Sequence, residues 1–454
     1  MTTAVYNDDT VAAISTPPGV GGISVVRISG NDALRIALNG LAIKTLKPRY
    51  AQFTHVVDLD TDEILDDVVV TYFKAPASYT GEDTVEISCH GGFSAAPAIL
   101  ALYYRLGARP ALPGEFTRRA FVNGKLDLLQ AEAVADLIHA VSDTGQKLAT
   151  RTLSGKLSEK VHALRNELTD IASILELELD FSEEEITPLP HEEINKKIDE
   201  AKTHIFALVD SYSAGKILRE GVLVPIVGRP NTGKSSLLNA LLEEDRAIIS
   251  HIPGTTRDTI EESFAHQGFL FRLVDTAGLR KTQDPIEKIG TERAYKTLGD
   301  ADMILLVVDI TMTDGYAFEK QFLSRYSKIP VIVVYNKIDL SFDLPVLDAE
   351  ISIAVSATHH QHLDVLLEKM LSTIQLHYRV DGSTIAITKQ RHKHALLQVI
   401  EALNCARQAI FQSLSNEYIA LDIREAINAL DDITGHTTSE DVLNNIFDHF
   451  CIGK

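Results

Sequence analysis

At 454 residues the chain is too long for one ordinary hydrophobic core, and its length suggests about three domains. Hydrophobic residues make up 45% and charged residues 23%, no apolar run is long enough to cross a membrane, and residues 1–10 are unlike a signal peptide. We therefore expect a cytoplasmic protein with no membrane span. The formal net charge of −20 argues against wholesale coating of a nucleic-acid backbone, although a small basic patch or a basic partner could still bring RNA to the chain.

The amino-terminal part of the chain is predicted to form a small α+β domain. The predicted strands occupy 11–16, 23–29, 67–73 and 84–88, and the predicted helices occupy 33–43 and 94–106. Three charged residues stand in or beside these apolar segments: Arg27, Glu86 and Lys125. Each must face solvent, form an ion pair or bind a ligand, and the residues alone leave these alternatives open.

A long amphipathic helical region begins at residue 128. Leucine and isoleucine recur within 164–177 at three- and four-residue spacing, which is the period of one helix face. Pro188 and Pro190 interrupt this pattern, and a second helix is predicted at 191–209.

Helix returns after residue 380. Apolar stripes at 395–406 and 420–430 predict two helices, and a Thr437-x-x-Glu440 capping box predicts the start of a last one. Neither helical arm looks complete alone, so we infer one all-α domain formed from both arms, with a nucleotide domain inserted between them. Two separate helical domains are the alternative. The predicted domains are 1–122 (α+β), 123–220 (first helical arm), 221–380 (inserted α/β G domain) and 381–454 (second helical arm).

The inserted segment opens with a phosphate loop. Residues 222–227 form an apolar run typical of a buried strand, residues 228–235 read Gly-Arg-Pro-Asn-Thr-Gly-Lys-Ser, and a helical pattern follows at 236–242. Glycines let the backbone wrap round a phosphate, Lys234 reaches the outer phosphates and Ser235 is an oxygen ligand for Mg²⁺. The residues expected to contact the nucleotide here are Asn231, Thr232, Gly233, Lys234, Ser235 and Ser236.

Strands predicted at 302–309, 329–335 and 351–357 indicate a mostly parallel, doubly wound sheet, and further motifs follow its strands. Asp275-Thr276-Ala277-Gly278 supplies a carboxylate beside Mg²⁺ and a glycine N–H for the γ-phosphate. Thr256 is a hydroxyl ligand that could hold Mg²⁺ only when the γ-phosphate is present, as in a switch loop.

Two later motifs select the base. In Asn336-Lys337-Ile338-Asp339 the ionised Asp339 only accepts hydrogen bonds, so it matches the adjacent N1–H and amino donors of guanine and not the edge of adenine. Ser356 and Ala357 end the last strand and can place a backbone N–H near the guanine oxygen. The sequence therefore predicts GTP as the nucleotide.

The sequence offers two candidates for the residue that activates the attacking water. Leu279 follows the Asp-x-x-Gly motif where many small GTPases have glutamine, and leucine cannot orient water. Arg280 and Glu287 are the candidates, and Glu287 either polarises the water or begins the next helix. Asn231 could bind a monovalent cation where other GTPases use an arginine finger.

These motifs and the carboxyl terminus together resemble the MnmE (TrmE) family, the bacterial and organellar GTPases of tRNA wobble-uridine modification. The resemblance covers essentially the whole chain. Outside the G domain it is carried by Thr16-Pro17-Pro18-Gly19, Arg27-Ile28-Ser29-Gly30, Gly81-Glu82-Asp83, His90-Gly91-Gly92, Pro113-Gly114-Glu115-Phe116, Lys125-Leu126-Asp127-Leu128 and Cys451-Ile452-Gly453-Lys454.

The resemblance implies an amino-terminal domain that dimerises and binds a tetrahydrofolate one-carbon donor, either the 5-formyl or the 5,10-methylene derivative. The matching folate residues are Arg27, Glu86, Lys125 and Lys454. It also implies K⁺-assisted pairing of two G domains, with Glu287 positioning the water. The matching K⁺ residues are Asn231, Ser250, Ile252 and Thr255.

The resemblance further implies a partner, the flavoprotein MnmG (GidA), which joins the homodimer in a heterooligomer and acts with it on tRNA. Together they would build an aminomethyl or carboxymethylaminomethyl group on C5 of uridine 34. The resemblance implies that Cys451 is functionally important. The alternative is that Cys451 is a buried thiol with only a packing role. The alternative functions are a GTP-dependent ribosome-assembly or signalling switch and a folate-dependent methyltransferase that needs no partner.

One stretch departs from the family pattern. The loop after Ala357 reads Thr-His-His-Gln-His and lacks the glycine that is common there, which leaves its conformation open. Its three histidines suggest either a metal site or a solvated loop, and the sequence places no carboxylate or cysteine ligand nearby.

Overall fold

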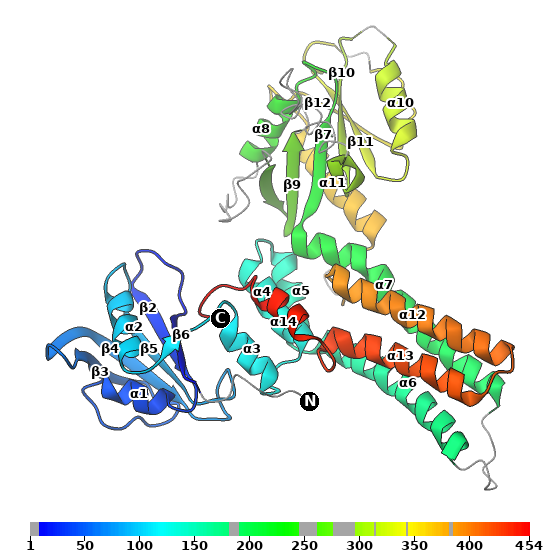
Figure 1. The fold of residues 1–454 in the computed structure, drawn as a ribbon. Helices are drawn as coiled ribbons and strands as arrows, with labels where there is room; N and C mark the ends of the chain where they lie inside the picture. The colour runs from blue at the N-terminus through cyan, green and yellow to red at the C-terminus, as the bar shows by residue number, and fades with distance from the viewer. Residues whose placement is uncertain are drawn as a thin grey trace, which may run out of the picture. The chain divides into compact units, whose positions relative to one another are not determined.

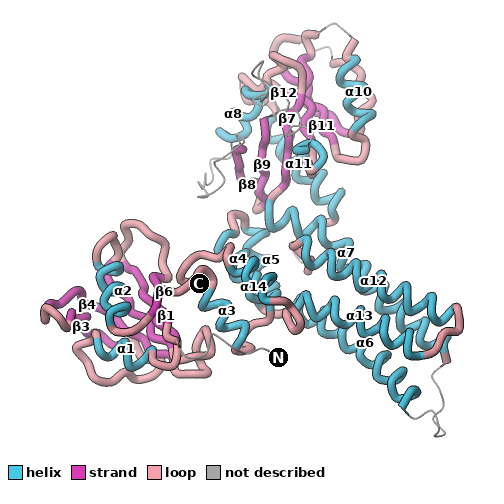
Figure 2. Tube along the Cα trace, in the orientation of Figure 1, coloured by secondary structure: helices cyan, strands magenta, loops and turns pink. Residues whose placement is uncertain are grey.

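The computed structural model describes residues 9–180, 190–244, 261–275, 296–312, 315–341, 344–380 and 385–454 (Figures 1 and 2). Its contacts divide the chain into two compact units. The first unit comprises Met1–Ala135, Leu153–Pro188 and Gln408–Lys454, and the second comprises Asp136–Thr152 and Leu189–Arg407.

The first unit contains a six-stranded sheet in the order β3-β4-β5-β2-β1-β6. Its strands are antiparallel except for the β1–β6 pair. Alternate residues of β2 and β5 pack with α1 and α2 in the core of this domain, which leaves Arg27 and Glu86 paired on the other face. The bounds are β1 Val11–Ile14, β2 Ile23–Ser29, α1 Ala33–Asn39, β3 Gln52–Asp58, β4 Glu63–Phe73, β5 Thr84–His90, α2 Ala95–Arg105 and β6 Arg109–Pro110.

Helices from both predicted arms pair within the first unit. Helix α6 (Lys156–Asp180) lies along α13 (Asn416–Thr434), where the Arg165 guanidinium donates to Asp431 at 2.5 Å and 3.2 Å. Helix α14 (Glu440–Phe447) packs on α4 (Leu128–His139) through an apolar cluster, close to α3 (Glu115–Val122).

A second inter-arm pair lies in the second unit. Helix α7 (His191–Glu220) is joined to α12 (Gln390–Phe411) by an ion pair of Arg407 with Asp199 (3.1 Å) and a hydrogen bond of Lys202 with Asn404 (2.7 Å). Helix α5 (Asp143–Leu153) belongs to the same unit. The predicted pairing of the two helical arms is confirmed, because each arm supplies one helix to each pair.

The G domain of the second unit is built on a sheet in the order β12-β11-β10-β7-β9-β8. Its pairs are parallel apart from β8–β9, as predicted for a mostly parallel α/β domain. Alternate residues of β10 enter two apolar clusters, one shared with α8 and α11 and one with α10, so helices cover both faces (Figure 1). The bounds are β7 Val222–Val227, α8 Lys234–Glu244, β8 Glu261–His266, β9 Phe269–Asp275, β10 Ile304–Asp309, α10 Ala317–Arg325, β11 Val331–Asn336, β12 Ile351–Val355 and α11 Leu363–Tyr378.

Several local expectations are corrected. Strands β3, β6 and β8 were not predicted, because all three are edge strands that carry polar residues. The capping-box prediction was wrong: Ser439 is the residue before α14, and the Thr437 hydroxyl donates to Asp432 at 3.0 Å instead. Glu440 accepts a hydrogen bond from Arg118 (2.5 Å), a tertiary partner that local spacing cannot reveal.

The remaining predictions on architecture stand as follows. The multidomain fold class is confirmed, while the domain boundaries at 122, 220 and 380 stay predictions. Across the described ranges, no helix is both long and apolar enough to cross a membrane.

Candidate functional site

The phosphate loop connects β7 to α8, as its sequence context predicts. The loop passes so close to its neighbours that a Cβ on Gly228 would meet the Val307 carbonyl and a Cβ on Gly233 would meet the Asn336 amide. Gly233 also has φ +94°, a conformation that favours glycine. Asn231 adopts φ +63°, so its backbone is turned in the left-handed sense within the loop.

The polar groups expected to meet phosphate and Mg²⁺ lie in or beside this loop. The Lys234 ammonium donates to the Arg229 carbonyl at 2.6 Å, and the Ser235 hydroxyl donates to Asp275 at 3.1 Å. A hydroxyl and a carboxylate that close together offer the hard oxygen donors that Mg²⁺ prefers, so the residues present fit the ion. Thr232 is fully buried, whereas Ser236 is exposed on α8.

The base-selecting motifs reach the same edge of the sheet. The Asn336 amide donates to the Thr232 carbonyl (2.9 Å) and accepts from the Ala357 N–H (3.1 Å), so it joins the phosphate loop to the last strand's motif. The Ser356 hydroxyl donates to Asp339 at 2.5 Å, and this bond holds the pKa of the Asp339 carboxyl below its ordinary value. Asp339 is therefore an acceptor, as guanine recognition requires.

Lys337, which follows β11, contacts the phosphate loop. Its ammonium donates to the Asn231 carbonyl (2.9 Å) and to the Asp309 carboxylate (2.5 Å). Burial acts to raise the pKa of Asp309, but hydrogen bonds from Lys337 and Thr311 outweigh it and lower that pKa. Asp309 ends β10 and was missed from the sequence, since no recognised motif contains it.

Several predicted site residues lie outside the described residues, and the structure says nothing of their placement. They are Ser250, Ile252, Thr255, Thr256, Thr276, Ala277, Gly278, Arg280 and Glu287.

The loop at 358–362, which carries three histidines, has a defined conformation. His360 (φ +53°) and His362 (φ +58°) both adopt the left-handed conformation that the absent glycine would favour. The His362 ring faces the Ala354 carbonyl (2.9 Å), and His360 lies 3.7 Å from Glu243 and 3.6 Å from Glu244 of α8. The tertiary structure thus brings carboxylates near the loop that the local sequence does not supply, but among the described residues no three metal-ligating side chains gather there.

Replacing His360 by glycine is expected to stabilise the G domain by about 0.5 kcal/mol, because relief of left-handed strain exceeds the loss of the half-exposed contacts with Glu243 and Glu244. The midpoint of thermal unfolding should rise by about 1–2 °C. The matched control is His359→Gly, at a residue without positive φ, which should lower the midpoint. A lower midpoint for His360→Gly would contradict this account.

Three of the four residues predicted to bind folate lie together on one face of the amino-terminal sheet. Arg27 on β2 pairs with Glu86 on β5 at 2.8 Å, with side chains 13% and 29% exposed. The Arg27 guanidinium also lies over the rings of Tyr79 (5.4 Å) and Phe116 (5.3 Å), which sequence reasoning missed because no local pattern links them.

Lys454 is the third member of this group. Burial, and then the nearby Arg27 guanidinium, lower the pKa of the Lys454 ammonium, against the opposing effect of Glu86. Lys125, the fourth predicted residue, donates to the Pro76 carbonyl at 3.2 Å in the loop that carries Tyr79.

The carboxyl-terminal tail reaches this group by docking on the amino-terminal part of the chain. Ile452 forms an antiparallel bridge with Pro113, and the Gly114 N–H donates to the Cys451 carbonyl at 3.4 Å. Gly453 has φ +97°, and a Cβ there would meet the Ile14 carbonyl. The Cys451 side chain is exposed, so the buried-thiol alternative is wrong.

A cavity of about 540 Å³ adjoins the docked tail. It is lined by Ile14, by the glycine- and proline-rich segments 16–21 and 91–93, and by Ile452. Small residues and exposed backbone therefore form most of its wall, close to the group around Arg27.

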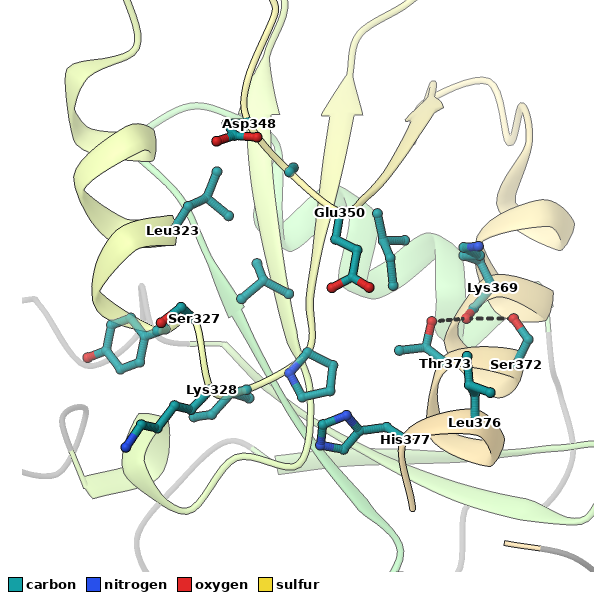
Figure 3. Close-up of a pocket in the computed structure, with 16 residues that line it drawn as sticks. Leu323, Ser327, Lys328, Asp348, Glu350, Lys369, Ser372, Thr373, Leu376 and His377 are labelled. Carbon is teal, nitrogen blue, oxygen red and sulfur yellow. Dashed lines mark hydrogen bonds between the residues drawn. The ribbon is translucent and has the colours of Figure 1, made fainter. Parts of the chain in front are cut away.

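A second hollow, of about 560 Å³, lies in the G domain at the amino ends of β11 and β12. The hydroxyls of Ser372 and Thr373 both donate to the Lys369 carbonyl on one of its walls (Figure 3). None of the nucleotide motifs lines this hollow, because they follow the carboxyl ends of the strands.

A parallel sheet whose carboxyl ends gather a phosphate loop, a Mg²⁺-type oxygen pair and a guanine-selective carboxylate defines a P-loop GTPase. Family models for the MnmE helical domain and for the GTP-binding protein TrmE amino terminus match residues 128–451 and 10–125. The chain belongs to the MnmE family of tRNA modification GTPases.

Individual proteins support this membership over the whole length. The tRNA modification GTPase MnmE of Natranaerobius thermophilus is 42% identical over 98% of this chain and 100% of its own length, and that of Clostridioides difficile is 40% identical over 99% and 100%. Among solved structures, Aquifex aeolicus Era bound to GDP.AlF4⁻ is 28% identical, with a TM-score of 0.27, over 39% of this chain and 65% of that chain. The G domain of T. maritima FeoB is 27% identical, with a TM-score of 0.25, over 35% and 99%.

Proposed function

We propose that the chain couples GTP hydrolysis to modification of C5 of wobble uridine 34 in tRNA. It acts with the flavoprotein MnmG and uses a one-carbon group from a tetrahydrofolate derivative to build the aminomethyl or carboxymethylaminomethyl substituent. The observation that carries this proposal is the docked tail, which sets Lys454 beside the Arg27–Glu86 pair.

The charges in that group suit a folate ligand. Arg27 and Lys454 offer positive charge for its carboxylates, and Glu86 is an acceptor for the N–H groups of its pterin ring. The rings of Tyr79 and Phe116 already hold Arg27 in place, so the guanidinium is oriented before a ligand arrives. Lys125 approaches from the neighbouring loop and completes the proposed set.

Apolar side chains around the adjoining cavity support a homodimer. Val20, Ile23, Phe93 and Ile452 line it and expose 88%, 67%, 75% and 62% of their surfaces. Exposed apolar residues gathered around one opening are typical of an interface, and a second copy of this domain is the occupant that we propose. Cys451 stands exposed beside Ile452 and would face the chemistry carried out there.

In the G domain, Ser235 and Thr256 would hold Mg²⁺, with Asp275 beside them. Asn231, Ser250, Ile252 and Thr255 would surround K⁺. When bound, both cations would supply positive charge beside the phosphates, where negative charge develops in the transition state. Glu287 would position the attacking water, with Arg280 as the other candidate in the same segment, and K⁺ would favour pairing of two G domains.

The cation requirement tests the G-domain part of this proposal. GTP hydrolysis by the full-length chain should be at least tenfold faster in K⁺ than in Na⁺ at equal ionic strength, because K⁺ takes the place of an arginine finger. Glu287→Ala should lose at least tenfold in kcat while binding GDP normally. Equal rates in K⁺ and Na⁺, together with normal hydrolysis by Glu287→Ala, would overturn the mechanism.

The alternatives make different predictions for cellular tRNA. A ribosome-assembly or signalling switch predicts normal uridine 34 in a strain that lacks the gene, as measured by nucleoside mass spectrometry. A methyltransferase that needs no partner predicts modification in a strain that lacks the flavoprotein. The proposed function predicts unmodified uridine in both strains.

A further inference from the structure

A buried carboxylate on α10 contacts the phosphate loop, and none of the nucleotide motifs accounts for it. Glu319 lies in the first turn of α10 and is 0% exposed. Its Oε2 accepts a hydrogen bond from Arg229 Nη2 at 2.8 Å, and the Arg229 guanidinium also lies 6.0 Å from the centre of the Phe318 ring. Arg229 follows the first glycine of the loop, 90 positions before its partner.

The backbone of Arg229 is the part of the loop that holds Lys234. Its carbonyl accepts from the Lys234 ammonium at 2.6 Å and from the Thr232 hydroxyl at 3.0 Å. The side chain of Arg229 is thus fixed from α10, while its carbonyl orients two residues expected to meet the nucleotide. A change at Glu319 would therefore release the phosphate loop at Arg229, its second residue.

Core packing alone does not account for Glu319. Its Oε1 is buried and, within the described ranges, has no hydrogen-bond partner, although the surrounding cluster of this sheet face is apolar. A buried carboxylate with one unsatisfied oxygen costs stability, and an apolar side chain of similar volume would pack there without that cost. What the carboxylate adds is a directed, charge-assisted bond to the loop.

We propose that Glu319 is a positioning residue for GTP: through Arg229 it holds the phosphate loop in the conformation that receives the phosphates. A preformed loop binds nucleotide without first becoming ordered, so removal of the bond weakens binding of the ground state and the transition state alike. The inference rests on GTP binding by this family and not on the proposed tRNA chemistry, so its failure would leave that chemistry untouched.

The test uses the full-length chain. Glu319→Ala should raise KM for GTP and Kd for a fluorescent GDP analogue about tenfold while kcat stays within about twofold, and Glu319→Gln, which keeps the shape and one acceptor, should raise both about threefold. The matched control is Asp302→Asn, at a buried carboxylate just before β10 of the same sheet that accepts from the Leu223 N–H at 2.9 Å. It should lower the thermal midpoint and leave KM and Kd within about twofold.

A double variant separates positioning from general destabilisation. Because Arg229 and Glu319 act as one unit, Arg229→Ala combined with Glu319→Ala should have the same Kd as the weaker-binding single variant. A Kd equal to the product of the two single effects would overturn the proposal. A Kd for Glu319→Gln within twofold of the unaltered chain would overturn it as well, and this variant decides the matter if Glu319→Ala does not fold.

Discussion

Replacing Asp339 by asparagine is expected to weaken GTP and GDP binding by about 100-fold or more and to create affinity for xanthine nucleotides. The ionised Asp339 carboxylate accepts hydrogen bonds from the N1–H and the amino group of guanine. Asparagine keeps one acceptor but turns a donor toward the amino group, which leaves two donors facing each other. Xanthine carries an oxygen at that position and restores the match.

The measurement is the Kd of fluorescent GDP and XDP analogues for the full-length chain. The matched control is Asp364→Asn, at an exposed carboxylate in the first turn of α11, which should leave both values unchanged within about twofold. The Ser356 hydroxyl can still donate to the asparagine side-chain oxygen, so the loop should keep its shape. Retention of GDP affinity within threefold by Asp339→Asn would show that this residue does not select the base.

Replacing Gly453 by alanine is expected to reduce modified uridine 34 by more than about tenfold, while GTP hydrolysis stays within about twofold. The new Cβ would meet the Ile14 carbonyl, and φ +97° is strained for any residue with a side chain. The tail would leave its bridge with Pro113 and withdraw Lys454 from the Arg27–Glu86 pair. The nucleotide motifs lie at 228–357 and contain no tail residue.

Nucleoside mass spectrometry of tRNA from a deletion strain that carries the variant gene gives the result. Gly315→Ala serves as the control, because Gly315 also has positive φ (+82°) but a Cβ there would meet nothing within 4 Å. Alanine there carries backbone strain without a clash, so uridine 34 modification should stay unchanged. Normal modification with Gly453→Ala would mean that the docked tail takes no part in the chemistry.

The nucleotide site could be predicted from the sequence to an unusual extent because its parts are contiguous. The phosphate loop, the residues 336–339 and the pair Ser356–Ala357 each follow a strand of a parallel sheet, so recognising the motifs also places them at one edge. The structure agrees for the motif residues that it describes. It adds the bonds from Asn336 and Lys337 to the phosphate loop, which depend on side-chain orientation.

The amino-terminal group was harder to predict. Arg27 and Glu86 stand 59 positions apart, and only the register of β2 with β5 makes them direct neighbours. The residues alone left a solvent-facing charge, an ion pair and a ligand site open, and the structure shows an ion pair that is largely buried on the Arg27 side. No pattern in the sequence linked Tyr79 or Phe116 to Arg27.

The sequence by itself determined the class of protein, the nucleotide, the multidomain fold class and the pairing of two helical arms, because each of these follows from local motifs or from periodicity that one segment carries. Only the tertiary structure decided which distant side chains meet: Lys454 with Arg27, His360 with Glu243, and Glu319 with Arg229. Such contacts depend on chain topology and strand register. These bring together residues that lie far apart in the sequence, and no local pattern predicts that they meet.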